Sequence, residues 1–255
     1  MFDAESLREM DIKRLADFMG NPDLDAYKNK AEDDDYSAFF FHPLTIKSVV
    51  DATVASRTPI RILELGSGNG ANGRTLCRLI DPDGDLSLHL VHLDFFDRNL
   101  LEASKRDKEF SQLRRNFSFQ CIQADVKSPD TREKLKSFFE ETVDIAFSIK
   151  FFHNTPVKIT REMAQFLSSI ITTGGIFILQ CYGTHRWVDE IINGLNRVRG
   201  HGYPNSVSVD RILAKRFLKN AGFRLVYKTT NKASDTGVFN HFQHARYDYY
   251  FEKTK

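Results

Sequence analysis

Short apolar runs alternate along most of the chain with segments whose apolar residues recur at helical spacing. The apolar runs predict strands at Ile60–Leu65, Leu86–Leu93, Phe117–Gln123, Val143–Ile149 and Ile176–Tyr182. The segments between them predict helices at Ala71–Ile80, Asn99–Leu113, Thr131–Glu141 (with Phe138 and Phe139 facing inward) and from Pro156 to about Ile171, with Gly174 and Gly175 after the last. Strands that alternate with helices predict a parallel sheet covered by helices on both faces.

The pattern changes toward the carboxyl-terminal end. A helix predicted at Val209–Ala221 is closed by Gly222, and glycine is the residue that most often ends a helix. Two apolar runs, Phe223–Thr230 and Arg246–Lys253, then follow with no helical segment between them. Because a parallel pair needs a crossover connection, we expect these two strands to be antiparallel at the edge of the sheet.

Two segments lie outside this alternation. Residues 1–58 are predicted to form a helical cap that precedes a core domain spanning residues 59–255. Residues 183–207 separate the fifth strand from the next helix, and we interpret them as an insert that covers a substrate. An ordinary amphipathic helix is the alternative, because Trp187, Ile191, Leu195 and Val198 recur at core-facing spacing.

The composition restricts the class of protein. A chain of 255 residues that is 41% hydrophobic can bury a sizeable core. Its net charge of +2 argues against a strongly polyanion-binding protein, although residues 1–45 carry 5 Lys/Arg against 11 Asp/Glu and residues 184–255 carry 13 against 6. The three cysteines are widely spaced and predict no metal site. The sequence has no signal-peptide pattern and no apolar run near the roughly 20 residues that span a bilayer, so we expect a cytoplasmic protein with no membrane partner.

A glycine-rich sequence, Glu64–Gly70, follows the first strand and opens the first helix. Glycines let the backbone turn tightly and approach a ligand closely, and the start of the helix offers free N–H groups to that ligand. An acid at the end of the strand suits hydroxyl groups or an amine better than a phosphate. The sequence therefore predicts a site for a nucleoside-type cofactor.

This motif and the order of the elements resemble the class I S-adenosylmethionine-dependent methyltransferases over residues 60 to 253. The resemblance implies an α/β fold, a Rossmann-like, doubly wound and mostly parallel sheet of seven strands whose last strand is antiparallel. It implies that S-adenosylmethionine is the cofactor, with the glycine loop around its amino-acid end, Asp94 at the ribose and Asp125 near the adenine. The cofactor-binding residues that it implies are Glu64, Gly66, Ser67, Gly68, Asn69, Gly70, Asp94, Phe95, Asp125, Val126 and Ser148.

A nicotinamide cofactor is the alternative, because Gly66–Ala71 also fits the G-x-G-x-x-A pattern and Asp94 could hold its ribose. The methyltransferase is favoured by the charge at Glu64, by Asp125 as a further acid at a strand end, and by the last strand pair without a crossover helix. Individual residues also have structural alternatives. Asp94 could cap a helix, Asp125 could cap a helix or form a turn, and Phe95 could be a core residue.

The acceptor site is predicted from residues that follow the fourth and fifth strands. His153 lies just beyond the fourth strand, where an imidazole could serve as a general base, and a histidine that anchors the loop is the alternative. An arginine of the insert could bind an acceptor carboxylate bidentately, and tyrosines could close over a planar ring. The candidate acceptor-binding residues are Tyr36, His153, Arg186, Arg197, Arg199 and Tyr203.

These observations favour methyl transfer to an oxygen, nitrogen or carbon atom of a small molecule, anionic or aromatic, because no separate binding domain is evident. One alternative is an RNA or protein methyltransferase that uses a basic face formed by Arg211, Lys215, Arg216, Lys219 and Arg224. Nucleic acid is the less favoured partner. A second alternative is a partner protein that keeps the fold and binds the cofactor without catalysing a reaction.

Overall fold

The structure is a computed structural model, and it describes residues 51, 59–139, 142–149, 157–182, 211–232 and 245–254. The predicted helical cap, apart from residue 51, and the predicted insert at 183–207 lie outside the described residues.

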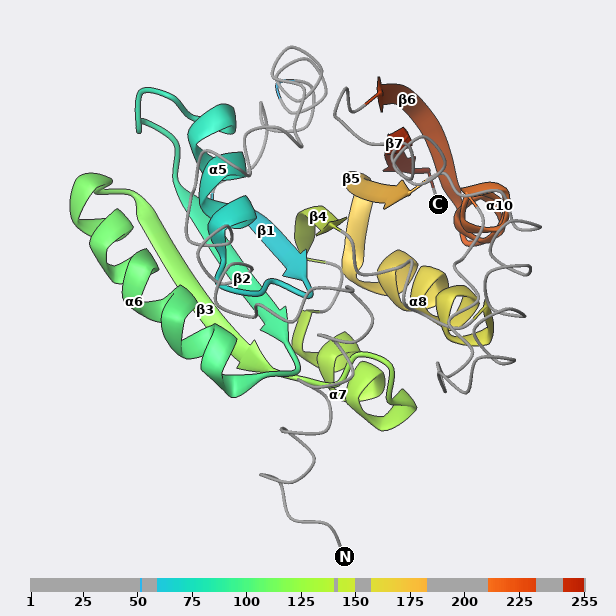
Figure 1. Ribbon diagram of the computed structural model, residues 1–255, viewed down its shortest axis with the longest axis horizontal. Coiled ribbons are helices and arrows are strands. Elements are labelled where there is room, and N and C mark those ends of the chain that lie inside the picture. The colour runs from blue at the N-terminus through green and yellow to red at the C-terminus, as the bar shows by residue number, and fades with distance from the viewer. Residues whose placement is uncertain are drawn as a thin grey trace, which may run out of the picture.

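The described chain forms the strands β1 (Ile60–Leu65), β2 (Leu88–Asp94), β3 (Phe117–Gln123), β4 (Val143–Ile149), β5 (Ile171–Tyr182), β6 (Phe223–Lys232) and β7 (Ala245–Lys253). Its helices are α5 (Ala71–Ile80), α6 (Asp97–Leu113), α7 (Pro129–Phe139), α8 (Val157–Ile170) and α10 (Arg211–Asn220). The strands form one sheet in the order β3-β2-β1-β4-β5-β7-β6 (Figure 1).

The directions of the strands confirm the predicted fold class. Strands β1 to β5 pair in parallel, and β7 lies between β5 and β6, antiparallel to both. The antiparallel pair predicted at the edge of the sheet is therefore β6 and β7, with β6 outermost. The result is the predicted seven-stranded, mostly parallel sheet whose last strand is antiparallel.

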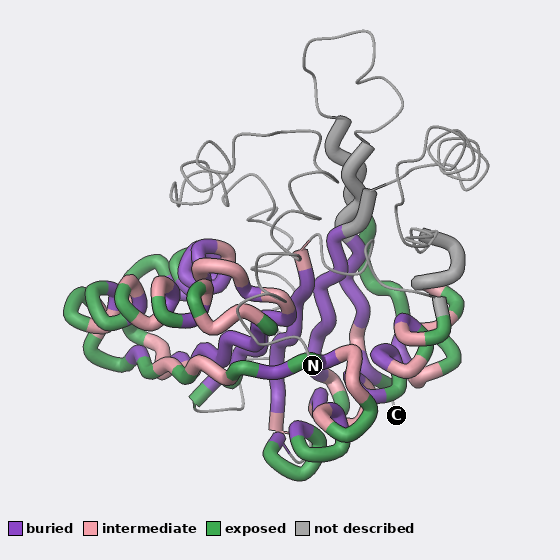
Figure 2. Tube along the Cα trace, turned by 60° about the horizontal axis from the view of Figure 1, so that its bottom comes forward, coloured by how far each residue is buried: buried purple, intermediate pink, exposed green. Residues whose placement is uncertain are grey.

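Both faces of the sheet are buried, which explains why its central strands are apolar at nearly every position. Successive residues of β1 point to opposite faces, so Leu63 and Leu65 join one core cluster while Ile60 and Ile62 join the other. Helices α7, α8 and α10 cover the first face, and α5 and α6 cover the second. Figure 2 shows buried residues along the central strands and exposed residues on the helices. Among the described helices, none has the length and apolar character to cross a bilayer.

Two local predictions were wrong. Phe139 is buried as predicted, but Phe138 is 55% exposed, because neighbouring residues of a helix point about 100° apart and cannot both face one core. Strand β5 begins at Ile171, five residues earlier than predicted, since Ile171 pairs with Val143 as soon as α8 ends. Gly174 and Gly175 therefore lie within β5, where the register with β4 shifts, and do not follow α8 as loop residues.

Candidate functional site

The site lies at the carboxyl ends of β1, β2, β3 and β4. Strands β2 and β3 lie on one side of β1 and β4 lies on the other, so the strand order reverses at β1. Open α/β sheets bind their ligands at such a switch point. The glycine loop follows β1, Asp94 is the last residue of β2, and Asp125 comes two residues after the end of β3. Ser148, near the end of β4, pairs in register with Leu65 of β1. The fold thus brings four predicted parts of the cofactor site to one edge.

The glycine loop has a backbone that glycine alone adopts without strain. Gly66, Gly68 and Gly70 have φ angles of 70°, 55° and 77°, in the left-handed region. The carbonyl oxygen of Leu93 accepts hydrogen bonds from the N–H groups of Gly66 and Ser67, at 2.8 and 3.0 Å, and so fixes the loop against β2. A Cβ atom built on Gly68 would meet no atom of the described residues within 4 Å. The middle of the loop therefore faces open space, which a ligand can enter.

Asp94 connects the end of β2 to this loop. Its Oδ2 accepts a hydrogen bond from the N–H of Gly68 at 2.8 Å, and its Oδ1 accepts from the N–H of Phe96 at 2.8 Å and from Asn99 Nδ2 at 3.3 Å. Burial raises the pKa of Asp94, and these hydrogen bonds oppose the rise. Helix α6 follows Phe96 and has no side-chain cap, so Asp94 is not the helix cap that the sequence left as an alternative. A carboxylate accepts about four hydrogen bonds, which leaves Asp94 capacity for a ligand hydroxyl.

The segment after β3 combines an exposed acid with a buried anchor. Asp125 is exposed, and its Oδ1 accepts a hydrogen bond from the N–H of Lys127 at 3.0 Å within a turn. Val126 is 5% exposed and belongs to the core. Arg132 of α7 fixes this turn, because its Nη1 donates to the carbonyl oxygens of Val126 and Lys127 while its Nη2 bonds Glu162 of α8 at 2.6 Å. Arg132 could not be predicted as a site residue, because in the sequence it resembles any charged residue of a helix and only its burial distinguishes it.

Phe95 lies between these two acids in the sequence and is not a core residue. Its side chain is 51% exposed, and its ring meets the edge of the Phe96 ring at a centroid distance of 5.2 Å. The carbonyl oxygen of Phe95 accepts a hydrogen bond from Gln123 Nε2 at the end of β3. An exposed aromatic ring beside Asp94 is available to cover a planar ligand group.

Glu64, together with His92, Asp107 and Arg74, forms a network of buried charged residues, which we call the buried charge network. His92 Nδ1 lies 2.8 Å from Glu64 Oε2, and His92 Nε2 lies 2.8 Å from Asp107 Oδ2. Arg74 Nη1 donates to Asp107 Oδ1 at 2.9 Å, and Arg74 Nη2 donates to the carbonyl oxygen of Asn69 in the glycine loop at 3.1 Å. The four residues are at most 2% exposed. The network therefore runs through the core between the sheet and helices α5 and α6, and reaches the loop.

The charges of this network balance. Burial lowers the pKa of His92, but its hydrogen bonds to Asp107 and Glu64 and their negative charges raise that pKa to about 9. Burial raises the pKa of Glu64, opposed by the hydrogen bond and charge of His92 and by the charge of Arg74. At neutral pH an imidazolium and a guanidinium thus face two carboxyl groups, which is the pairing that buried charges require.

Two buried hydroxyl groups lie near the ends of β1 and β4. Within the described part of the chain, neither Ser67 Oγ nor Ser148 Oγ has a hydrogen-bond partner. Leaving a buried polar atom unsatisfied costs about 1–3 kcal/mol, so each such atom calls for an explanation. A polar ligand bound at the carboxyl ends of β1 and β4 would supply the missing partners.

Gly73 sets how closely helix α5 packs against the buried charge network. A Cβ atom built on Gly73 would lie 2.8 Å from Glu64 Oε2 and 2.9 Å from both His92 Cε1 and Leu90 Cδ2. We expect Gly73→Ala to lower the free energy of unfolding by about 1–3 kcal/mol, since overpacking forces such side chains to shift. Urea denaturation of the wild-type and Gly73→Ala proteins measures the difference in the free energy of unfolding. Asn72→Ala, in the same turn of α5, is the control, and an unchanged midpoint for Gly73→Ala would contradict the packing described here.

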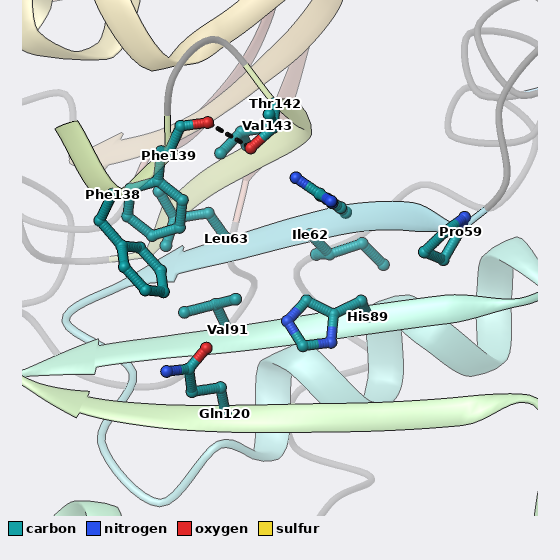
Figure 3. A pocket seen from close by; sticks show the side chains of 11 residues that line it. Pro59, Ile62, Leu63, His89, Val91, Gln120, Phe138, Phe139, Thr142 and Val143 are labelled. Atoms are coloured by element: carbon teal, nitrogen blue, oxygen red, sulfur yellow. Dashed lines mark hydrogen bonds between the residues drawn. The ribbon is translucent and has the colours of Figure 1, made fainter. Parts of the chain in front are cut away.

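A cavity of about 380 Å³ lies away from the glycine loop, over β1, β2 and β3 and beside the end of α7. Figure 3 shows the rings of Phe138 and Phe139 on one side of it and His89, Val91 and Gln120 on the strands. His89 Nδ1 lies 2.9 Å from Ser118 Oγ, and burial and the charge of Arg61 lower the pKa of His89. None of the predicted cofactor residues lines this cavity, so it is separate from the candidate site.

The predicted acceptor-binding residues, namely Tyr36, His153, Arg186, Arg197, Arg199 and Tyr203, lie outside the described residues. The predicted basic face is described in part. Arg224 pairs with Glu252 at 2.6 Å, and Lys215 Nζ lies 5.4 Å from the centre of the Tyr249 ring. Arg216 and Lys219 are exposed. Two of these cations therefore already have partners within the protein.

No protein-family model and no curated protein matches this sequence. Solved structures with the same fold include magnesium protoporphyrin IX methyltransferase from Synechocystis PCC 6803 with bound SAH, at a TM-score of 0.56 and 13% identity, over 94% of this chain and 98% of that one. A geranyl diphosphate methyltransferase in complex with SAM matches at a TM-score of 0.54 and 8% identity, over 88% and 92% of the two chains. An arsenic(III) S-adenosylmethionine methyltransferase from Chlamydomonas reinhardtii matches at a TM-score of 0.51 and 12% identity, over 82% and 73%. The chain thus has the fold of the class I methyltransferases.

Proposed function

We propose that this protein is an S-adenosylmethionine-dependent methyltransferase that acts on a small molecule. The observation that carries the proposal is the position of the glycine loop beside Asp94 at the switch point of the sheet. The N–H of Gly68 donates a hydrogen bond to Asp94, and the side of the loop at Gly68 is open among the described residues. The match in fold to methyltransferases along most of the chain supports it. A nicotinamide enzyme is less supported, because β7 pairs antiparallel with β5 in place of a further parallel strand.

The residues at the site fit this cofactor. Asp94 would accept hydrogen bonds from the ribose hydroxyls, and Phe95 would cover the adenine beside Asp125. Val126 would complete the adenine pocket from the core. The glycine loop (Gly66, Gly68, Asn69 and Gly70) would surround the amino-acid end of the cofactor, where the buried hydroxyls of Ser67 and Ser148 would find partners. Glu64 would bind its ammonium group.

When bound, the cofactor supplies a methyl group activated by the sulfonium, so the protein mainly positions the two reactants and excludes water. A base is needed only where the acceptor atom must lose a proton, and His153 is the candidate for that role. Arg186, Arg197 or Arg199 would bind an anionic acceptor, with Tyr36 and Tyr203 against a planar one. A small acceptor is supported by the solved methyltransferases of this fold, which include one for geranyl diphosphate and one for arsenic(III).

Calorimetric titration of the wild-type protein with S-adenosylmethionine, S-adenosylhomocysteine and NADH tests the proposal. We expect both adenosyl sulfur compounds to bind with micromolar affinity and NADH not to bind. Binding of NADH alone would identify a nicotinamide enzyme instead. Binding of all three with similar weak affinity would show that the site recognises only adenosine, and would count against methyl transfer.

A further inference from the structure

The buried charge network begins and ends at the glycine motif. One end is Glu64, the first residue of the motif, and the other end is the guanidinium of Arg74 on the carbonyl oxygen of Asn69. Between them, His92 and Asp107 form an unbroken chain of contacts of 2.8–2.9 Å. A core ion pair that only stabilised the protein would not need to connect both ends of a ligand-binding loop.

We propose that Arg74, His92 and Asp107 are positioning residues for the amino-acid end of the cofactor, acting through Glu64 and the peptide group of Asn69. None of the three would touch the cofactor itself. This inference rests on the function proposed above.

The network fixes the direction of the Glu64 carboxylate. His92 holds Oε2, and no donor among the described residues reaches Oε1. Glu64 is the penultimate residue of β1, close to the glycine loop, so Oε1, which has no donor among the described residues, can accept a hydrogen bond from a ligand ammonium group. The two cations of the network balance its two carboxylates, which favours an ionised Glu64 despite its burial.

The network also sets the position of the loop backbone. Besides the hydrogen bond from Arg74 to Asn69, the backbone at Gly70 lies directly on the network. A Cβ atom at Gly70 would be 2.9 Å from His92 Cε1 and 3.0 Å from Arg74 Nη1. A shift of either side chain would therefore move the last turn of the loop, where it meets α5.

Asp94, at the other half of the site, does not belong to this network. Its hydrogen bonds come from Gly68, Phe96 and Asn99. The adenosine end and the amino-acid end of the cofactor would thus be held by separate sets of residues. Two ligands distinguish them: S-adenosylhomocysteine carries both ends, whereas 5′-methylthioadenosine carries the adenosine thioether without the amino acid.

Calorimetric titration of both ligands into variants shown by circular dichroism to be folded tests the proposal. Arg74→Lys keeps the buried cation but loses the fork that reaches two acceptors, and Asp107→Leu removes the link between Arg74 and His92. We expect each to weaken S-adenosylhomocysteine by about tenfold or more, the effect of one charged hydrogen bond, and to change 5′-methylthioadenosine by less than about twofold. Asp107→Asn is the rescue, because its amide oxygen can still accept from Arg74 and its amide nitrogen can donate to Nε2 of His92, which becomes neutral without the Asp107 charge and keeps Nδ1–H for Glu64.

Arg132→Lys is the matched control. It is the same substitution at another buried arginine, which holds the turn after β3 at the adenosine end, so we expect it to weaken both ligands equally. The proposal is overturned if Arg74→Lys also weakens both ligands equally, or if folded Arg74→Lys and Asp107→Leu proteins bind S-adenosylhomocysteine as tightly as the wild type. Failure of the wild type to bind either ligand would overturn the proposed function itself, a distinct result.

Discussion

Replacing Asp94 with alanine should weaken the binding of S-adenosylhomocysteine by about 100-fold while the protein stays folded. In the proposed site this carboxylate accepts hydrogen bonds from the ribose, and hydrogen bonds to a charged group contribute about 1.5–3 kcal/mol each. A loss of about 3 kcal/mol corresponds to a little over two decades of affinity. The substitution also frees the N–H of Gly68, which Asp94 now holds at 2.8 Å, so the loop itself becomes less well ordered for the ligand.

Asp97→Ala provides the control for this measurement. Asp97 lies three residues further on, in the first turn of α6, and its removal changes the local charge by the same amount. Its expected contribution is through the helix dipole, about 0.3–1 kcal/mol of stability, so the affinity should stay within about threefold of the wild type. An equal loss of S-adenosylhomocysteine affinity in the two variants would show that Asp94 acts through its charge alone. An unchanged affinity for Asp94→Ala would show that the ribose does not bind at Asp94.

The fold could be predicted because its signals are local. A strand buried on both faces, such as β4, is apolar at nearly every position, and helices between such strands leave few alternatives to a parallel sheet. The glycine loop could be predicted for the same reason, since three positive φ angles within five residues require the three glycines that the sequence shows together. Asp94 could be placed at the site because it directly follows a predicted strand.

The partners of Glu64 could not be predicted, because they come from three separate elements. His92 is 28 residues from Glu64 in the sequence, and Asp107 is 33 residues from Arg74. Each looks ordinary in its own segment: a histidine in an apolar strand, an acid on a polar helix. Their pairing depends on the register of β1 with β2, which sets Glu64 beside His92, and on the packing of α5 and α6 over that face. The spacing of residue types along the sequence indicates neither this register nor this packing.

His92→Leu should be the most destabilising substitution considered, lowering the free energy of unfolding at pH 6.5 by about 3–5 kcal/mol. That is the usual effect of removing one partner from a buried ion pair, because Glu64 keeps a buried charge and loses its hydrogen bond. Urea denaturation measures the difference. His89→Leu is the matched control on the same strand, since His89 is half-buried and bonded only to Ser118 among the described residues, and should change stability by less than about 1 kcal/mol.

The pH dependence of the wild-type protein provides an independent measure of the same network. The pKa of His92 is raised to about 9 in the folded protein from its ordinary value of 6.5, so between these values the folded state holds a proton that the unfolded state has released. Stability from this group is therefore complete below pH 6.5 and is lost as the pH rises toward 9, by on the order of 3 kcal/mol. The lowered pKa of His89 acts in the opposite direction and only below pH 6.5, so His89→Leu should retain the decline. A stability profile that stays flat from pH 6.5 to 9 would mean that the folded network retains no proton that the unfolded chain has released, so that neither His92 nor Glu64 is protonated in this range.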